Sequence, residues 1–170
     1  MKILTYFAAG IGVLALVSVA GLFIAGAMIS ESQSFTNEVE INASEDRVWE
    51  VINDRDRFTE WQDQLKKVEV VDEIHWTEYP KDSPEPLKFM VAADERPDKM
   101  EFHYTMGNDF TGHWKGELTP IESGVKLRTT DSYSTDGMLT KILIYAFFDL
   151  DSFAKDWNGK LKTRVESLNK

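Results

Sequence analysis

The sequence contains no cysteine among its 170 residues. This absence excludes disulfide bonds, a thiolate nucleophile, cysteine-bound zinc and lipid attachment through a cysteine side chain. The chain also lacks a glycine-rich phosphate-binding loop, a nucleophile elbow and a helical pair of metal-binding histidines. The sequence therefore indicates no metal and no organic cofactor.

Basic side chains are in the minority. The chain has 19 Lys and Arg against 29 Asp and Glu, which gives a formal net charge of −10. Phosphate groups are bound by clustered basic side chains, so an acidic surface of this size disfavours nucleic acid and anionic lipid head groups. We expect no nucleic-acid partner.

Charge of either sign is missing from residues 3–30, where most side chains are apolar. A helix crosses a bilayer core with about 20 apolar residues, so this run predicts a transmembrane helix over residues 3–30 with the lipid bilayer as its partner. The alternative is a signal peptide cleaved near Ala25, but the run exceeds the roughly 7–15 apolar residues typical of that segment. Lys2 before the run and acidic residues after it predict a single-pass inner-membrane protein with its soluble domain on the extracytoplasmic side.

The rest of the chain is rich in short segments with alternating apolar and polar residues, each typical of a strand. These segments cover residues 35–41, 67–71, 74–79, 87–92, 99–106, 113–119 and 125–133. Ser44 is suited to cap a short helix, and a second short helix is predicted over residues 55–62. The last six strands are joined by short turns, which cannot connect parallel strands, so the pattern predicts an antiparallel meander.

The C-terminal segment, residues 138–168, has apolar residues at helical spacing. Its predicted buried stripe consists of Leu150, Phe153, Ala154, Trp157, Leu161, Val165 and Leu168. Spacings of three and four residues are typical of a helix with one buried face. The strands and this helix together predict an α+β fold in which a curved sheet wraps around one long helix.

The segment VEINASEDRVWEVINDRDRFTEWQ, residues 39–62, resembles the opening of the START-like superfamily, also called SRPBCC. That superfamily includes polyketide cyclase/dehydrase and lipid-transport proteins. The resemblance implies a helix-grip domain over residues 34–169, with a seven-stranded antiparallel curved sheet around a long C-terminal helix. Its motifs are structural and imply no particular catalytic residue.

Strand and helix periodicity predicts which side chains line the space between the sheet and the helix. The predicted lining consists of Phe89, Phe102, Tyr104, Trp114, Leu127, Tyr145, Phe153 and Trp157. Large aromatic side chains of this kind form either a filled core or an apolar pocket. The sequence is compatible with both.

Asp131 and Tyr133 share the strand parity of Leu127, which predicts that they point inward. A buried carboxylate is costly unless it is paired or protonated, so an inward Asp131 is a candidate acid or base, together with Tyr133 and Tyr104. The alternative is that the strand ends before Asp131 and this side chain faces water. His103 has the opposite parity to Phe102 and is predicted on the convex face, as a surface histidine rather than a metal ligand.

These patterns favour a membrane-anchored domain that binds a small hydrophobic molecule or lipid in an apolar cavity. The alternatives are an enzyme of the cyclase/dehydratase type and a structural envelope protein with a filled core. An open cavity would have its entrance between the first turns of the C-terminal helix and the hairpin loops. Phe110, which ends one such loop, is then predicted to act as a lid or to dip toward the bilayer.

Overall fold

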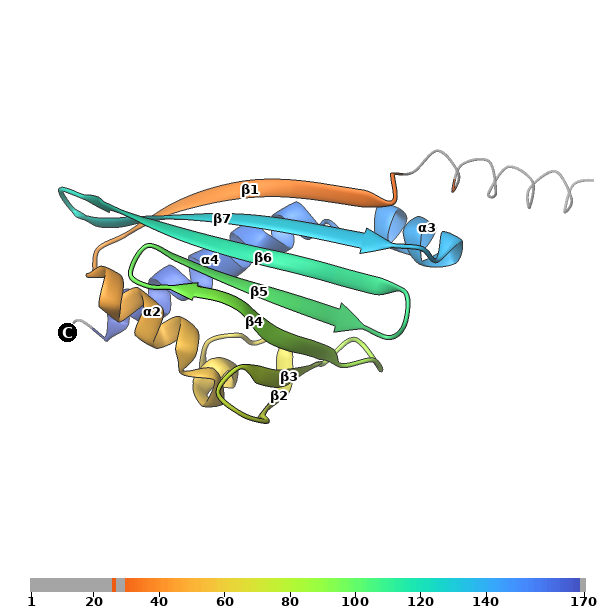
Figure 1. Cartoon of the computed structure of the whole chain (residues 1–170), viewed down its shortest axis with the longest axis horizontal. Coiled ribbons are helices and arrows are strands. Elements are labelled where there is room, and N and C mark those ends of the chain that lie inside the picture. The colour runs from red at the N-terminus through yellow and green to blue at the C-terminus, as the bar shows by residue number, and fades with distance from the viewer. Residues whose placement is uncertain (1–25, 27–29, 169–170) are drawn as a thin grey trace, which may run out of the picture.

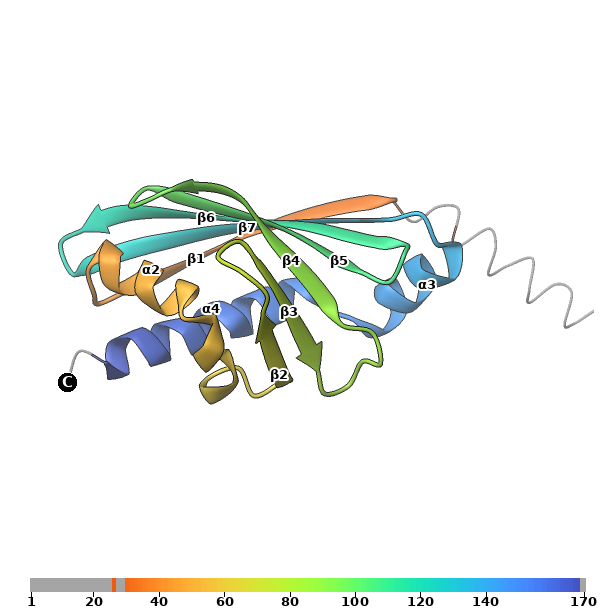
Figure 2. The same cartoon turned by 60° about the horizontal axis from the view of Figure 1, so that its bottom comes forward.

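The computed structural model describes residue 26 and residues 30–168. Its helices and strands are β1 (Ser32–Ile41), α2 (Glu45–Asn53), the 3-10 helix η1 (Arg55–Glu60), β2 (Leu65–Val70), β3 (His75–Pro80), β4 (Leu87–Glu95), β5 (Lys99–Met106), β6 (Phe110–Ile121), β7 (Gly124–Thr135), α3 (Met138–Phe147) and α4 (Leu150–Ser167). The strands form one seven-stranded sheet in the order β1-β7-β6-β5-β4-β3-β2. Figures 1 and 2 show α4 along the concave face of this sheet, with α2 and α3 at opposite ends.

All neighbouring strands are antiparallel, and the first strand pairs with the last. β1 and β7 align from Ser32 opposite Ser134 to Ile41 opposite Val125. This pairing places the beginning of β1 at the end of the sheet that α3 covers (Figure 1). The predicted antiparallel curved sheet with a C-terminal helix is confirmed.

The predicted single C-terminal helix is divided into α3 and α4. Phe148 has an extended backbone, with φ −122° and ψ 117°. Asp149 follows as the N-cap of α4, and its Oδ1 accepts a hydrogen bond from the Ser152 backbone N–H at 2.9 Å. A side chain that caps a new helix start stabilises the break, so the expectation of one uninterrupted helix was wrong at this point.

The buried line of α4 also differs in part from the predicted stripe. The buried residues are Ala154, Asn158, Leu161 and Val165, whereas Phe153 is 52% exposed. Asn158 Nδ2 donates a hydrogen bond to Thr129 Oγ1 on β7 at 2.9 Å, which holds this line of the helix against the sheet. A rotation of about 100° per residue then directs Phe153 outward.

The half of the interior nearer α2 is a filled apolar core. It contains Val48, Trp49 and Ile52 of α2, Leu161 and Val165 of α4, and Met100, Leu118, Val125 and Leu127 of the sheet. Removal of these side chains from water is the main force that holds α2 and α4 on the sheet.

None of the helices in the described part of the chain is long and apolar enough to cross a membrane. The predicted transmembrane helix at residues 3–30 lies outside the described residues, apart from Gly26 and Ser30.

Candidate functional site

The half of the concave face nearer α3 contains a line of polar side chains. Beyond Leu127, the inward positions of β7 are Thr129, Asp131, Tyr133 and Thr135. These residues share one face because successive side chains of a strand alternate between the two faces. Strand parity predicts the inward positions of Asp131 and Tyr133 from the sequence, and the structure shows that Thr129 and Thr135 extend the same line.

Asn158 adds a polar group from the opposite side of the interior. This buried α4 side chain donates to Thr129, while its Oδ1 has no hydrogen-bond partner among the described residues. Buried acceptors are nearly always paired, so an unpaired one is compatible with a ligand or water beside it.

Tyr104 on β5 leans across β6 toward this polar line. The strand register places Gly112 opposite both Tyr104 and Tyr133. A Cβ atom on Gly112 would lie 2.0 Å from Tyr104 Cζ and 2.6 Å from its Oη, so the phenol fills the space that a side chain would occupy. Burial, and then the negative charge of Asp131, raise the pKa of Tyr104. Tyr104 therefore stays a neutral hydrogen-bonding group.

Asp131 is the titratable residue at the centre of this region. It is partly buried, and it stands opposite Phe35 on β1 and Trp114 on β6. Its carboxyl group forms no hydrogen bond or ion pair with any described residue. Burial raises the pKa of Asp131 to about 7. Near neutral pH this carboxyl group therefore exists both protonated and ionised, and it can either donate or accept a proton.

A second inward carboxyl group belongs to Glu78 on β3. Its Oε1 accepts a hydrogen bond from Trp76 Nε1 at 3.0 Å, and Arg55 lies over the Trp76 ring at 4.1 Å from the ring centroid. Burial raises the pKa of Glu78 to about 7 in spite of this hydrogen bond and the Arg55 charge. The inward position of Glu78 was not predicted from the sequence, although Glu78 lies two residues after the apolar Trp76 and therefore on the same face of the strand.

A pocket of about 470 Å³ opens at the α3 end of the concave face. It is lined by Gln33, Phe35, Tyr133, Tyr145, Ala146, Phe148, Asp149, Leu150 and Asp151. The rings of Phe35 and Tyr133 have centroids 6.5 Å apart and form its inner wall. Phe35 is the β1 partner of Asp131, so this wall adjoins the titratable centre.

The predicted lining residues fall into three groups. Phe102, Trp114 and Leu127 are buried, whereas Phe89, Tyr104 and Trp157 are partly buried. The outward positions of Phe153 and of Tyr145, which is 72% exposed, contradict our expectation that they point inward. Tyr145 nevertheless lines the pocket, together with the residues of the α3–α4 junction that follows it.

Phe110 also differs from its predicted role. It is buried, with ring centroids 5.7 Å from Tyr133 and 6.1 Å from Tyr104. The residue therefore belongs to the inner aromatic packing and is neither a lid nor a membrane contact. Phe110 is the first residue of β6 and not part of the turn, and its position in the strand directs it to the concave face.

Residues 32–170 match the family described as polyketide cyclase / dehydrase and lipid transport. The chain belongs to this family. The match confirms the START-like resemblance of the sequence. A comparison with curated proteins finds no match.

Solved structures of low sequence identity share the fold of this family member. The ZhuI aromatase/cyclase from Streptomyces sp. R1128 has a TM-score of 0.64 and 12% identity, covering 82% of this chain and 96% of its own. Truncated norcoclaurine synthase from Thalictrum flavum has a TM-score of 0.60 and 12% identity, covering 79% and 93%. A START superfamily protein from Mycobacterium smegmatis has a TM-score of 0.57 and 14% identity, covering 82% and 99%. At these identities the similarity establishes the fold.

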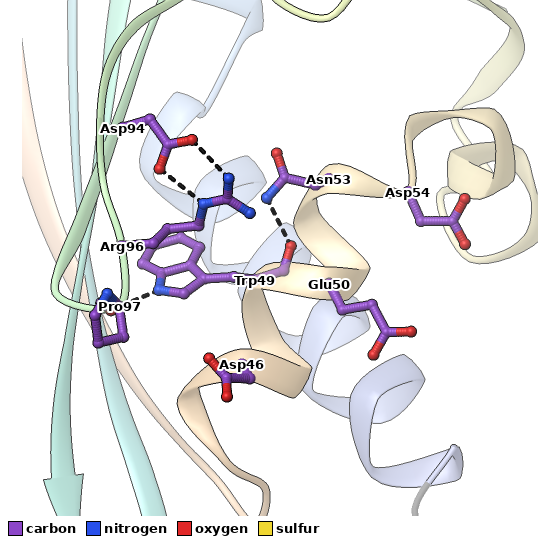
Figure 3. Close-up of a pocket in the computed structure, with 8 residues that line it drawn as sticks. All are labelled: Asp46, Trp49, Glu50, Asn53, Asp54, Asp94, Arg96 and Pro97. Atoms are coloured by element: carbon purple, nitrogen blue, oxygen red, sulfur yellow. Dashed lines mark hydrogen bonds and ion pairs between the residues drawn. The ribbon is translucent and has the colours of Figure 1, made fainter.

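A larger hollow of about 810 Å³ lies elsewhere on this family member, between α2 and the β4–β5 hairpin (Figure 3). Arg96 donates two hydrogen bonds to the carboxylate of Asp94, at 2.7 and 2.8 Å. Trp49 Nε1 donates to the Pro97 carbonyl at 2.6 Å, and Asn53 Nδ2 donates to the Trp49 carbonyl at 2.8 Å. The hydrogen bond from Trp49 to Pro97 joins α2 to the hairpin, whereas the other hydrogen bonds lie within the hairpin or within α2. We therefore assign these groups a structural role.

His103 and His113 lie on the convex face, as the parity of their strands predicts. They stand directly opposite each other on β5 and β6, with ring centroids 4.8 Å apart. His113 Nε2 lies 2.9 Å from Glu101 Oε2. Within the described residues, no group of three or more His, Asp or Glu is arranged to hold a metal ion.

Proposed function

We propose that this protein binds a small hydrophobic molecule with one polar group, on the concave face between β7 and the α3–α4 junction. The apolar part of the ligand would contact Phe35 and Tyr133, and its polar group would reach Asp131. The observation that carries this proposal is Asp131 itself. A partly buried carboxyl group without a described partner costs stability, and a ligand group that hydrogen-bonds to it would offset that cost.

The family and its structural relatives support this class of ligand. The family description includes lipid transport, and two relatives of the same fold are an aromatase/cyclase and norcoclaurine synthase. The proposal also includes an anchor: residues 3–30, which carry no charge, would hold the domain at the cell membrane on its extracytoplasmic side.

Binding of cis-parinaric acid to the purified full-length chain in a non-ionic detergent tests the ligand site. All five tryptophans lie in the domain, so tryptophan-sensitised emission reports probe that is close to it. We expect saturable binding near pH 5.5, and at least about tenfold weaker binding near pH 8, where ionised Asp131 repels the carboxylate of the probe. Asp131→Asn should bind at both pH values with a much smaller difference.

His103→Ala, on the convex face, is the control and should behave as the wild type does. Two results would contradict the proposal. One is the absence of saturable binding by the wild type, and the other is an unchanged pH response in Asp131→Asn.

A second candidate function is acid–base catalysis on the same ligand. It is favoured by the pKa of Asp131 of about 7, which suits proton transfer at neutral pH. Native mass spectrometry of detergent-extracted protein distinguishes the two functions. A binding protein should carry the same molecule in the wild type and in Asp131→Asn, whereas an enzyme whose acid or base is Asp131 should accumulate a substrate of different mass in the variant.

A further inference from the structure

The helix α3 exposes a wide apolar surface, which we call the α3 face. It consists of Met138, Leu139, Leu143 and Tyr145 of α3 and Phe148, which follows the helix. Every exposed residue among the described side chains of α3 is uncharged. Isolated surface hydrophobes are ordinary, but five exposed large apolar side chains within eleven consecutive residues indicate a surface that is covered by a partner.

The one basic side chain of α3 is paired with an acidic side chain. Lys141 is buried, and its Nζ lies 3.0 Å from Oε1 of Glu31. Glu31 is also the first charged residue after the uncharged run at residues 3–30. This ion pair therefore removes a positive charge from α3 and ties the helix to the point where that run ends.

A contact from inside the uncharged run reinforces this connection. A Cβ atom on Gly26 would lie 3.0 Å from Ile142 Cδ1 and 3.0 Å from Met138 Cγ. The backbone at residue 26 is thus packed directly on α3, next to the exposed α3 face. If the run crosses a bilayer, α3 lies at the surface of that bilayer, because only three residues separate Gly26 from Ser30, and the domain begins directly after Ser30.

We propose that the α3 face lies in the interfacial region of the same bilayer and contacts the lipid directly. Its apolar side chains would enter the boundary between head groups and acyl chains, where tyrosine is favoured. The absence of exposed basic residues on α3 means that this contact does not require anionic lipid.

This orientation has a consequence for the ligand, which rests on the proposed function. Tyr145 and Phe148 belong to the α3 face and also line the 470 Å³ pocket. The pocket would therefore open at the bilayer surface, and its ligand would be a molecule that partitions into the membrane and enters from it without crossing water.

The chain has no cysteine, so single-cysteine variants accept one fluorescent label at a chosen position. Full-length Leu143→Cys, labelled with bimane, is placed in phosphatidylcholine nanodiscs that hold one copy each. Met90→Cys on the convex face is the matched control, since Met90 is 40% exposed and Leu143 is 45% exposed. Lipid with a spin label near the head group should quench the Leu143 label at least about threefold more strongly than the Met90 label.

Two further variants complete the test. A label at Ala15→Cys should be quenched by lipid spin-labelled deep in the acyl chain, which checks the anchor. Leu139→Asp should reduce the quenching of a Tyr145→Cys label without changing the circular dichroism spectrum.

Equal quenching of the labels at positions 143 and 90, together with quenching of the label at position 15, would overturn the α3 contact alone. An unquenched label at position 15 would overturn the anchor and the contact together. Parinaric-acid binding in detergent depends on neither, so its outcome is judged separately.

Discussion

Trp114→Ala is expected to lower the free energy of unfolding by about 3–5 kcal/mol, the range measured for buried aromatic residues. Trp114 is 7% exposed and connects the sheet to α4. Its ring stacks on Phe102, with centroids 4.9 Å apart, and meets the edge of Trp157 at 5.7 Å. Denaturant unfolding of the full-length chain, followed by far-UV circular dichroism, measures the loss. Tyr145→Ala removes an exposed aromatic ring and should cost no more than about 0.5 kcal/mol.

Gly116 provides a sharper version of the same test. A Cβ atom at this position would lie 2.3 Å from Trp114 Cη2, so Gly116→Ala alone should destabilise the protein by displacing the indole. In the Trp114→Ala background the obstruction is absent, and the same substitution should be neutral or slightly stabilising. A coupling of at least about 1 kcal/mol between the two substitutions is therefore expected. Additive effects would show that the indole does not lie over Gly116.

The pattern of apolar residues was sufficient to predict the sheet because one face of each strand is buried. Under that condition, a shift of one residue in the pairing of a strand would move every side chain to the opposite face of the sheet. The alternation of apolar and polar residues was therefore sufficient to assign Phe102, Trp114 and Leu127 to the interior. The same reasoning correctly directed Asp131 and Tyr133 inward, because β7 continues to Thr135 and does not end before Asp131.

The C-terminal helix was predicted less well because its sequence is compatible both with one continuous helix and with two helices separated at Asp149. Phe148 and Leu150 both fit a continuous apolar helix, but Asp149 between them caps a new one. A second limit concerned Asn158, whose burial depends on its hydrogen bond to Thr129, 29 residues away in the sequence. A pattern of apolar residues does not predict the burial of a polar residue whose hydrogen-bond partner is distant in the sequence. The predicted buried face of the helix therefore included Phe153 and not Asn158.

The contact of the Tyr104 ring with Gly112 was not predicted from the sequence. It depends on β5 and β6 pairing in one particular register, which brings a glycine between two inward tyrosines. The result is that three candidate residues, Asp131, Tyr133 and Tyr104, belong to one region of the concave face. Two of them are neutral phenols, so the charge state of the region depends on Asp131, with Glu78 as a more distant contributor.

The charge state of Asp131 links the site to folding. Burial raises its pKa in the folded protein from 3.8 to about 7. Between these values the unfolded chain releases the proton while the folded chain retains it. The folded state then binds more protons than the unfolded state, so stability is complete below about pH 4 and falls as the pH rises to about 7. A side chain that reduces stability at neutral pH is the kind of residue expected at a binding or catalytic site.

Asp131→Asn is therefore expected to stabilise the protein near pH 8 and to change it little near pH 4. The pKa difference corresponds to at most about 4 kcal/mol, and because Asp131 is only partly buried we expect an increase of roughly 1–3 kcal/mol near pH 8. Asp151→Asn is a control of opposite sign. Lys155, and then Asn37, lower the pKa of Asp151, so its contribution to stability is present at neutral pH and is lost as the pH falls. Urea unfolding of both variants across pH 4–8 measures these slopes, and a loss of stability in Asp131→Asn near pH 8 would mean that the ionised carboxylate has a partner that offsets its burial.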